Sequence, residues 1–187
     1  GKKLNSPNDV VVASDGAIWF TDPPFGISGH YSGDKATPEL PNNVYRVDPS
    51  GKASVVASDV AAPNGLCFSP GEKKLYVVDS FSKPVTIRAY DVVDGGTKLA
   101  NGSVFFTCGE GEAPDGIRCD VHGNLWCPYG AVKEGMGGVL VLSPEGKRIG
   151  RIALPERAAN LCFGGAKRNR LFMVTGRGVY SLYVNTQ

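Results

Sequence analysis

Four oxygen-bearing side chains occur at the same point of a repeated sequence pattern. A carboxamide or carboxylate opens an apolar run in each of four units, at Asn8, Asn64, Asp115 and Asn160. Taken singly, each is best explained by a tight turn, because Asn-Gly and Asp-Gly tolerate positive φ. Gly is not constant, however, since Asp9 follows Asn8 and Leu161 follows Asn160. The oxygen persists, and Ca²⁺ prefers oxygen ligands, so four such groups brought together predict a site for a hard divalent cation.

Other chemistry-bearing residues give weaker signals. The chain has 2 His and 5 Cys, and no Cys pair has the spacing of a zinc site or a CxxC redox motif. A Gly-x-Ser-x-Gly nucleophile motif is absent. We interpret the cysteines as buried free thiols, with a Cys119–Cys127 disulfide across a short hairpin as the alternative. Their use weakly favours a reducing compartment, and we expect a cytoplasmic protein whose N-terminal targeting region, if any, is not in this chain.

Composition narrows the class of protein and its partners. The 187 residues carry a net charge of +2, with 42% hydrophobic and 20% charged residues. This balance indicates a folded chain and gives no electrostatic reason to expect nucleic acid or a membrane surface as a partner. No apolar run approaches the roughly 20 residues of a membrane-spanning helix. Gly (25) and Pro (13) are frequent, which favours short strands and turns over long helices.

The elements that position the four polar residues recur about every 50 residues. Each unit begins with two short strands joined by a tight turn, at 10–12 and 18–22, 63–68 and 75–79, 116–119 and 125–127, and 159–163 and 171–174. Further alternating runs at 44–47 and 53–56, 85–90 and 103–106, 139–142 and 148–152, and 179–183 complete the units. Four antiparallel strands per unit predict an all-β fold, a β-propeller of four-stranded antiparallel blades. WD40 repeats are disfavoured, because Trp-Asp is absent and the units recur at about 50 residues and not at the ~40–45 residues of that repeat.

The pattern predicts one domain over 1–187, with blades at about 7–58, 63–108, 114–154 and 159–185. The last unit stops after a third strand, and the chain begins directly at an innermost strand. We therefore expect an incomplete propeller of about four blades, from a fragment or a truncated chain. A closed four-bladed ring is the alternative.

Propeller geometry sorts the loops between two faces. If each inner strand starts at the top of the channel, rotational symmetry gathers Asn8, Asn64, Asp115 and Asn160 around its mouth. The segment 22–42, which contains Asp22 and His30, and the residues after 79, 129 and 175 emerge at the same mouth. His122 falls in a bottom turn and is expected to be solvated.

These residues resemble a known family. The segments 4–12, 19–26, 63–70, 77–80, 114–118 and 159–165 are similar to gluconolactonase-type lactonases of the SMP-30/gluconolactonase/LRE-like family. The resemblance implies a six-bladed propeller with a divalent metal, usually Ca²⁺, at the channel mouth; Zn²⁺, Mg²⁺ and Mn²⁺ are the alternatives.

The resemblance also implies residue roles. Asn64 and Asp115 match metal-binding residues, and Asp115 matches the proposed general acid/base. Asn8 matches an Asn that binds substrate or metal, and Asn160 has the repeat position of a substrate-binding residue. The metal-binding Glu of the family lies in a Glu-Gly-Pro-type segment that this sequence does not contain.

The implied reaction is metal-dependent hydrolysis of a sugar lactone to its aldonic acid. Asp22, His30 and Tyr129 would help to bind the small-molecule substrate. The alternatives are a non-catalytic propeller that binds a ligand or a protein, and an esterase or phosphotriesterase that uses the same metal site. The sequence does not predict an oligomeric state.

Overall fold

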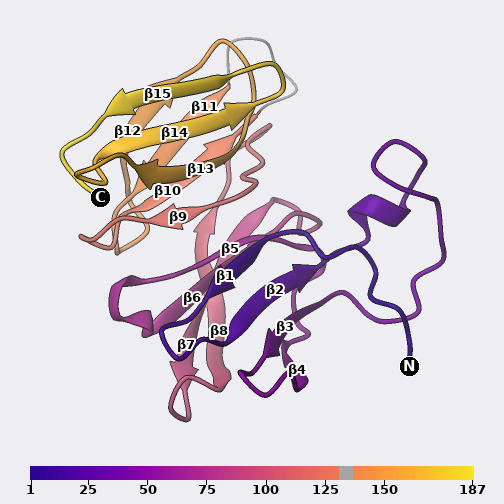
Figure 1. The fold of residues 1–187 in the computed structure, drawn as a ribbon. Helices are drawn as coiled ribbons and strands as arrows, with labels where there is room; N and C mark the ends of the chain where they lie inside the picture. Colours follow the sequence, from indigo (N-terminus) through magenta and orange to yellow (C-terminus); the bar gives the residue numbers. More distant parts are fainter. Residues whose placement is uncertain (131–136) are drawn as a thin grey trace.

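A computed structural model describes residues 1–130 and 137–187 as a nearly all-β protein (Figure 1). Four antiparallel sheets lie side by side, and each contains strands of one repeat unit in chain order. This arrangement confirms the predicted β-propeller architecture.

The first blade comprises β1 (Val10–Val12), β2 (Ile18–Asp22), β3 (Asn43–Val47) and β4 (Ala53–Ala57). The second comprises β5 (Pro63–Phe68), β6 (Lys74–Asp79), β7 (Thr86–Val93) and β8 (Lys98–Thr107). The third comprises β9 (Arg118–Cys119), β10 (Leu125–Tyr129), β11 (Gly138–Leu142) and β12 (Arg148–Ala153), and the fourth comprises β13 (Ala158–Gly164), β14 (Arg170–Thr175) and β15 (Val179–Tyr183). Two short 3₁₀ segments, η1 (Phe25–Ile27) and η2 (Pro70–Glu72), complete the described elements. No helix among the described residues has the length and apolar character needed to cross a membrane.

One hairpin is longer than the sequence predicts. The expected strands 85–90 and 103–106 extend to Val93 and back to Lys98, and a tight turn joins them. Asp94, Gly95 and Gly96 have φ of 52°, 66° and 84° in this turn. Such consecutive positive φ values reverse the chain within a few residues, so the β-ladder continues almost to the turn.

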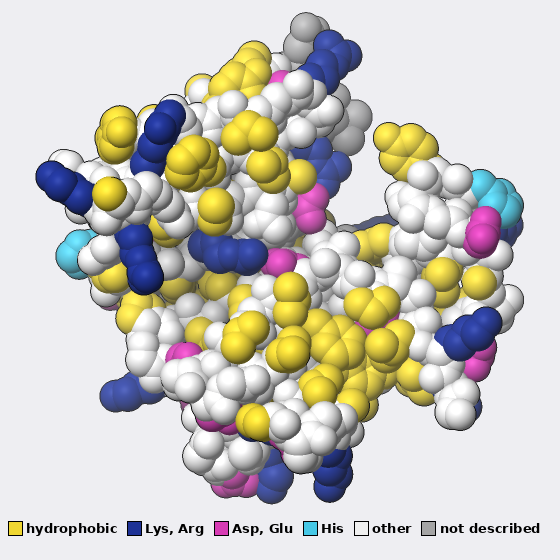
Figure 2. Space-filling model, viewed as in Figure 1, with side chains coloured by type: hydrophobic (Ala, Val, Ile, Leu, Met, Phe, Trp, Pro, Cys, Tyr) yellow, Lys and Arg dark blue, Asp and Glu magenta, His cyan; other side chains and the backbone are white. Residues whose placement is uncertain are grey.

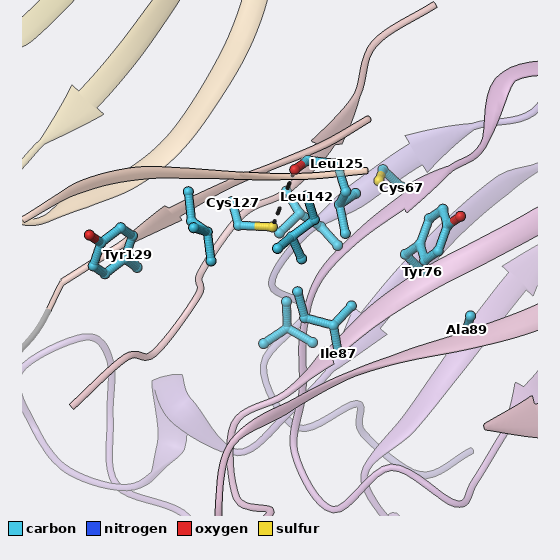
Figure 3. Close-up of a cluster of buried hydrophobic side chains, with 11 residues drawn as sticks. Cys67, Tyr76, Ile87, Ala89, Leu125, Cys127, Tyr129 and Leu142 are labelled. Atoms are coloured by element: carbon cyan, nitrogen blue, oxygen red, sulfur yellow. Dashed lines mark hydrogen bonds between the residues drawn. The ribbon is translucent and has the colours of Figure 1, made fainter. Parts of the chain in front are cut away.

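Three apolar clusters hold neighbouring blades together. One contains Trp19, Val44 and Leu66 between the first two blades, and another contains Met173 and Leu161 between the last two. The middle cluster joins the second and third blades through Cys67, Tyr76, Ile87, Leu125, Cys127, Tyr129 and Leu142 (Figure 3). Burial of these faces supplies the main stabilisation, at about 25 cal/mol per Å² of apolar surface.

The five cysteines are free thiols, and Cys119 and Cys127 do not form a disulfide. Cys67, Cys108 and Cys127 are buried as expected, and Cys119 is partly buried. Burial raises the pKa of the Cys67 and Cys127 thiols, which keeps them protonated and unreactive. The prediction of burial is wrong for Cys162, which is exposed. Its place in β13 alternates with that of the buried Leu161, so the two side chains point to opposite faces of the sheet.

Candidate active site at the starts of the inner strands

The inner strands are irregular where the candidate residues lie. Pairing of β5 with β6 changes register between Pro63 and Leu66, around Asn64. Pairing of β13 with β14 changes register between Ala158 and Asn160. Such irregularities change the direction in which a side chain points. The side chains of Asn64 and Asn160 therefore need not follow the regular alternation between the two faces of the sheet.

Gly65 and Gly116 are required by the close approach of neighbouring blades, not by turn geometry. Neither residue is among those with positive φ, so the turn explanation of Asn-Gly and Asp-Gly is wrong here. A Cβ on Gly65 would lie 2.0 Å from the backbone oxygen of Asp115. A Cβ on Gly116 would lie 2.2 Å from Cγ of Asn160. Each glycine lets the polar residue of the next blade lie against the preceding inner strand.

This packing brings Asn64 and Asp115 together. The Asn64 carboxamide lies near the Asp115 carboxylate and lowers its pKa, because an amide N–H favours the charged form. Its Nδ2 also donates to Oγ of Ser80 at 3.1 Å. Asn64 is only 7% exposed, yet its Oδ1 has no hydrogen-bond partner among the described residues. A buried carbonyl oxygen without a partner is costly, so this atom is a candidate ligand for a bound group.

The charge of Asp115 is set by its burial and by three neighbouring residues. Burial raises the pKa of its carboxyl, and the Arg157 guanidinium and Asn64 oppose that effect while Asp9 adds to it. Nη2 of Arg157 lies 3.3 Å from Oδ2 of Asp115. The net effect is a raised pKa, which strengthens the carboxylate as a base.

A second ion pair joins the first and third blades at the inner strands. Asp9 is buried, and its carboxylate accepts hydrogen bonds from the backbone N–H groups of Val10 at 2.9 Å and Leu66 at 3.2 Å. Nη1 of Arg118 lies 3.3 Å from Oδ2 of Asp9. The same Nη1 donates to the backbone oxygens of Ile117 and Leu66. Asp9 and Arg118 therefore link three inner strands.

The donor set at Asn64 and Asp115 fits a hard cation. Asn64 offers a buried oxygen that has no partner in the described part of the chain, and Asp115 offers an adjacent carboxylate. These are ligand types that Ca²⁺ and Mg²⁺ prefer. The described residues contain no group of three or more His, Cys, Asp or Glu side chains arranged for a metal. Oxygen atoms of Asn side chains would therefore have to supplement the one carboxylate.

The other two repeat positions differ in their surroundings. Asn8 is exposed, and its backbone N–H donates to the oxygen of Thr21 at 2.9 Å, just as that of Asp115 donates to Pro128 at 3.1 Å. Oδ1 of Asn160 accepts the backbone N–H of Leu161 at 2.8 Å. The roles of Asn8 in metal and substrate binding and of Asn160 in substrate binding stay predictions.

Asp22 holds the chain segment that leads into β1. It is fully buried, and its carboxylate accepts the backbone N–H groups of Asn5 at 2.9 Å and Ser6 at 2.8 Å. Burial raises the pKa of Asp22, and these two hydrogen bonds lower it without cancelling the rise. Asp79, at the same position of the next repeat, accepts two backbone N–H groups before β5 in the same way. Substrate binding by Asp22 stays a prediction, and its observed contacts are those of a positioning residue.

Tyr129 and His30 lie in very different environments. Tyr129 is buried in the middle cluster, and the Arg151 guanidinium lies 5.6 Å from its ring centroid. His30 is exposed in the long connection between β2 and β3. Figure 1 shows that this connection stands out beside the N-terminus, and Phe25 within it packs edge-on against Phe81 of the second blade. Substrate contacts of His30 and Tyr129 stay predictions.

The fold and the convergence of Asn64 with Asp115 define a β-propeller with a polar site at the starts of its inner strands. The chain belongs to the SMP-30/gluconolactonase/LRE-like family, whose region matches residues 1–177. A gluconolactonase from Zymomonas mobilis is 32% identical over 193 residues, which cover 100% of this chain and 52% of that protein. The resemblance inferred from the sequence is thereby confirmed.

Solved structures agree with this assignment. The structure of XC5397, a gluconolactonase from Xanthomonas campestris, superposes with a TM-score of 0.86 at 40% identity, covering 98% of this chain and 58% of that one. A calcium-binding protein, regucalcin, from Agrobacterium tumefaciens superposes with a TM-score of 0.73 at 25% identity, covering 91% and 53%. The chain thus spans a little over half of the length of these relatives.

Sequence reasoning missed Arg157 and the Asp9–Arg118 pair. Arg157 stands three positions before Asn160, and Glu112 and Asn5 stand three before Asp115 and Asn8. A comparison of the units at that position, where three of four residues are polar, was the available signal. The Asp9–Arg118 pair had no local signal, because the two residues are 109 positions apart.

Proposed function

We propose that this chain contributes the central part of a lactonase site that hydrolyses a sugar lactone to its aldonic acid with a divalent cation, most simply Ca²⁺. The observation that carries the proposal is the buried Oδ1 of Asn64, which has no hydrogen-bond partner in 1–130 or 137–187 and lies where Gly65 packs against the Asp115 backbone. The gluconolactonase relatives support the reaction class, and the calcium-binding relative supports the cation.

Oδ1 of Asn64 and the Asp115 carboxylate would hold the cation, with the carboxamide of Asn8 as the expected third group. When bound, the cation supplies Lewis-acid polarisation of the lactone carbonyl. Asp115 orients the attacking water and accepts its proton, for which a carboxylate with a raised pKa is suited. Asn64 fixes the carboxylate, and Ser80 in turn fixes the Asn64 amide.

Hydrolysis of glucono-δ-lactone, followed by acid release in a pH-stat, tests the proposal on the chain in its natural sequence context. We expect D115N and D115A to lower kcat by about 10²- to 10⁴-fold, the usual contribution of a general base. The matched control is D94N, because Asp94 lies in the β7–β8 turn and pairs with the exposed Lys98. Chelation should abolish activity, and Ca²⁺ should restore it and raise the melting temperature of the wild type but not of D115A.

Three results separate the remaining alternatives. Turnover of aryl esters or phosphotriesters without lactones would keep the site and change the substrate class. A cation-dependent rise in melting temperature without any turnover would favour a non-catalytic binding propeller. Full lactonase activity in D115A would contradict the proposed role of Asp115.

A further inference from the structure

A cavity of about 450 Å³ opens beside Asp115 between the second and third blades. The connections Ser82–Val85 and Gly109–Ala113 form two of its walls, and Gly130 and Arg157 complete the lining. Arg157 is the residue that joins this cavity to the candidate active site, since its guanidinium also lies 3.3 Å from the Asp115 carboxylate.

The position of Arg157 is fixed at its alkyl chain and open at its guanidinium. A Cβ on Gly130 would lie 2.0 Å from Cγ and 2.4 Å from Cδ of Arg157, so the alkyl chain rests directly on the Gly130 backbone. The Arg157 side chain is nevertheless 57% exposed, whereas the Asp115 side chain is 26% exposed. One rather long contact to Asp115 uses a single N–H group, and a guanidinium has five. The remaining donors form no hydrogen bond with other residues in 1–130 or 137–187, which leaves them to a ligand.

The charges around the cavity favour Arg157 over the other lining residues as a group that could bind an anion. Glu112 is already neutralised, because its two oxygens accept Nη1 and Nη2 of Arg148 at 2.7 and 2.6 Å. Its Oε2 also accepts the backbone N–H of Gly109 at 2.7 Å. Lys83 and Glu110 lie at the exposed walls and form no ion pair with any residue in 1–130 or 137–187. Of the cationic groups in the lining, only Arg157 borders the reacting carboxylate.

We propose that Arg157 binds the carboxylate that forms when the lactone ring opens, and that the cavity receives the hydroxylated remainder of the product. This inference rests on the proposed lactonase function. In the reaction, water adds to the ester carbonyl and the bond between the acyl carbon and the ring oxygen breaks. The ring oxygen takes a proton and becomes a hydroxyl group. The acyl carbon becomes a carboxylic acid of the same open-chain molecule, and this acid releases a proton. A neutral ester thus becomes an anion beside Arg157, which a guanidinium binds through two parallel hydrogen bonds.

We therefore expect Arg157 to contribute more to the affinity for the open-chain acid than to the affinity for the lactone. The D-gluconate inhibition constant and direct calorimetric binding of D-gluconate are the readouts. For R157Q we expect both constants to weaken at least about tenfold, the loss of a charge-assisted hydrogen bond. R157K should fall between, because it keeps the charge and loses the planar fork.

Two further variants separate the contact from general effects. G130A keeps the Arg157 charge but forces its alkyl chain to move, and it should weaken D-gluconate binding in the same direction. R177Q removes an exposed positive charge after β14 that does not line the cavity, and it should leave binding unchanged. Ca²⁺ affinity, measured by calorimetry without substrate, should be unchanged or tighter in R157Q, because a competing positive charge next to Asp115 is removed.

The outcomes distinguish this inference from the proposed function. A wild-type protein that hydrolyses lactones while R157Q binds D-gluconate as tightly as before overturns the role of Arg157 alone. Equal weakening of D-gluconate binding in R157Q and R177Q also overturns it, because the loss of any positive charge would then explain the result. A wild-type protein that neither hydrolyses lactones nor binds D-gluconate rejects both proposals. Loss of D-gluconate binding in R157Q and G130A, with R177Q unchanged, supports the inference.

Discussion

Two blade junctions use the same aromatic packing but differ in how they satisfy a buried tryptophan. Trp19 of the first blade packs edge-on against Phe68 of the second, with ring centroids 5.4 Å apart and an interplanar angle of 83°. Trp126 of the third blade packs edge-on against Phe163 of the fourth, at 5.6 Å and 87°. The repeat has thus preserved an aromatic pair in a geometry that contributes about 0.5–1.5 kcal/mol beyond burial.

The difference lies at the indole N–H. Nε1 of Trp126 donates to Oδ2 of Asp120 at 3.0 Å, whereas Nε1 of Trp19 is buried and has no partner among the described residues. The repeat places Ala13 where the third blade has Asp120, and Ala17 where it has Asn124. Both turns otherwise close alike, through Ala13 N to Ala17 O and Asp120 N to Asn124 O, each at 2.9 Å.

Other contacts stabilise the first junction. The Arg46 guanidinium lies 5.9 Å from the Trp19 ring centroid and pairs with Asp15 at 2.7 Å. Glu72 of the second blade accepts the backbone N–H of Ser14 at 2.8 Å and its hydroxyl at 2.7 Å. The aromatic pair is therefore common to these two junctions, whereas the polar contacts are specific to each. Figure 2 shows exposed apolar side chains on the visible face, gathered over β2 and over the fourth blade.

Removal of the Asp120 carboxylate should cause the largest difference in stability between the two junctions. Besides Trp126, Asp120 accepts the backbone N–H and the Nδ2 of Asn124 and the backbone N–H of His122. D120A leaves these donors without an acceptor, and we expect a loss of about 3 kcal/mol in the free energy of unfolding. Urea denaturation measures the loss. D15A, in the corresponding turn of the first blade, should cost about 1 kcal/mol, because its ion pair is partly exposed. Equal losses would show that the two turns contribute alike.

Acid should remove part of the same stabilisation. Burial would raise the pKa of Asp120, but hydrogen bonds from Asn124, Trp126 and His122 outweigh it and lower the pKa. A pKa lowered by folding stabilises the protein above the unfolded value of about 3.9 and loses that effect as pH falls through the folded value. The difference in unfolding free energy between wild type and D120N should therefore be largest above pH 5 and shrink as pH falls below about 4. A difference that is constant with pH would contradict this account.

The paired substitutions W126F and W19F test the indole contact directly. Both remove similar volume from an aromatic pair, but only W126F takes a donor from a buried carboxylate. We expect W126F to be the more destabilising by about 1–2 kcal/mol, the value of a hydrogen bond to a charged group. Thermal and urea unfolding of the two variants under one condition measure the difference. A larger loss in W19F would mean that its indole has a partner in solution.

The sequence predicts the blades well because each strand pair and turn is encoded locally. It also predicts that Asn64 and Asp115 converge, since the propeller symmetry follows from the repeat. The reason for the adjacent glycines was not predictable, because the close approach of Gly65 to Asp115 arises only when two blades pack. Arg157 stands at a repeat position that is polar in three of the four units, but its contact with Asp115 forms only when the blades pack. Ala13, by contrast, could have been recognised by aligning the units.

The smallest expected effect comes from giving the Trp19 indole N–H an acceptor, since it has none in 1–130 or 137–187. A13N places an amide oxygen where Asp120 stands in the third blade and avoids a second negative charge near Asp15. A cavity of about 310 Å³ borders Ala13, Trp19 and Phe68, so a longer side chain has room. We expect a gain of about 0.5–1 kcal/mol in unfolding free energy. The gain should vanish when A13N is made in W19F, because the donor is then absent, and a gain that persists there would place its origin in the turn and not in the indole.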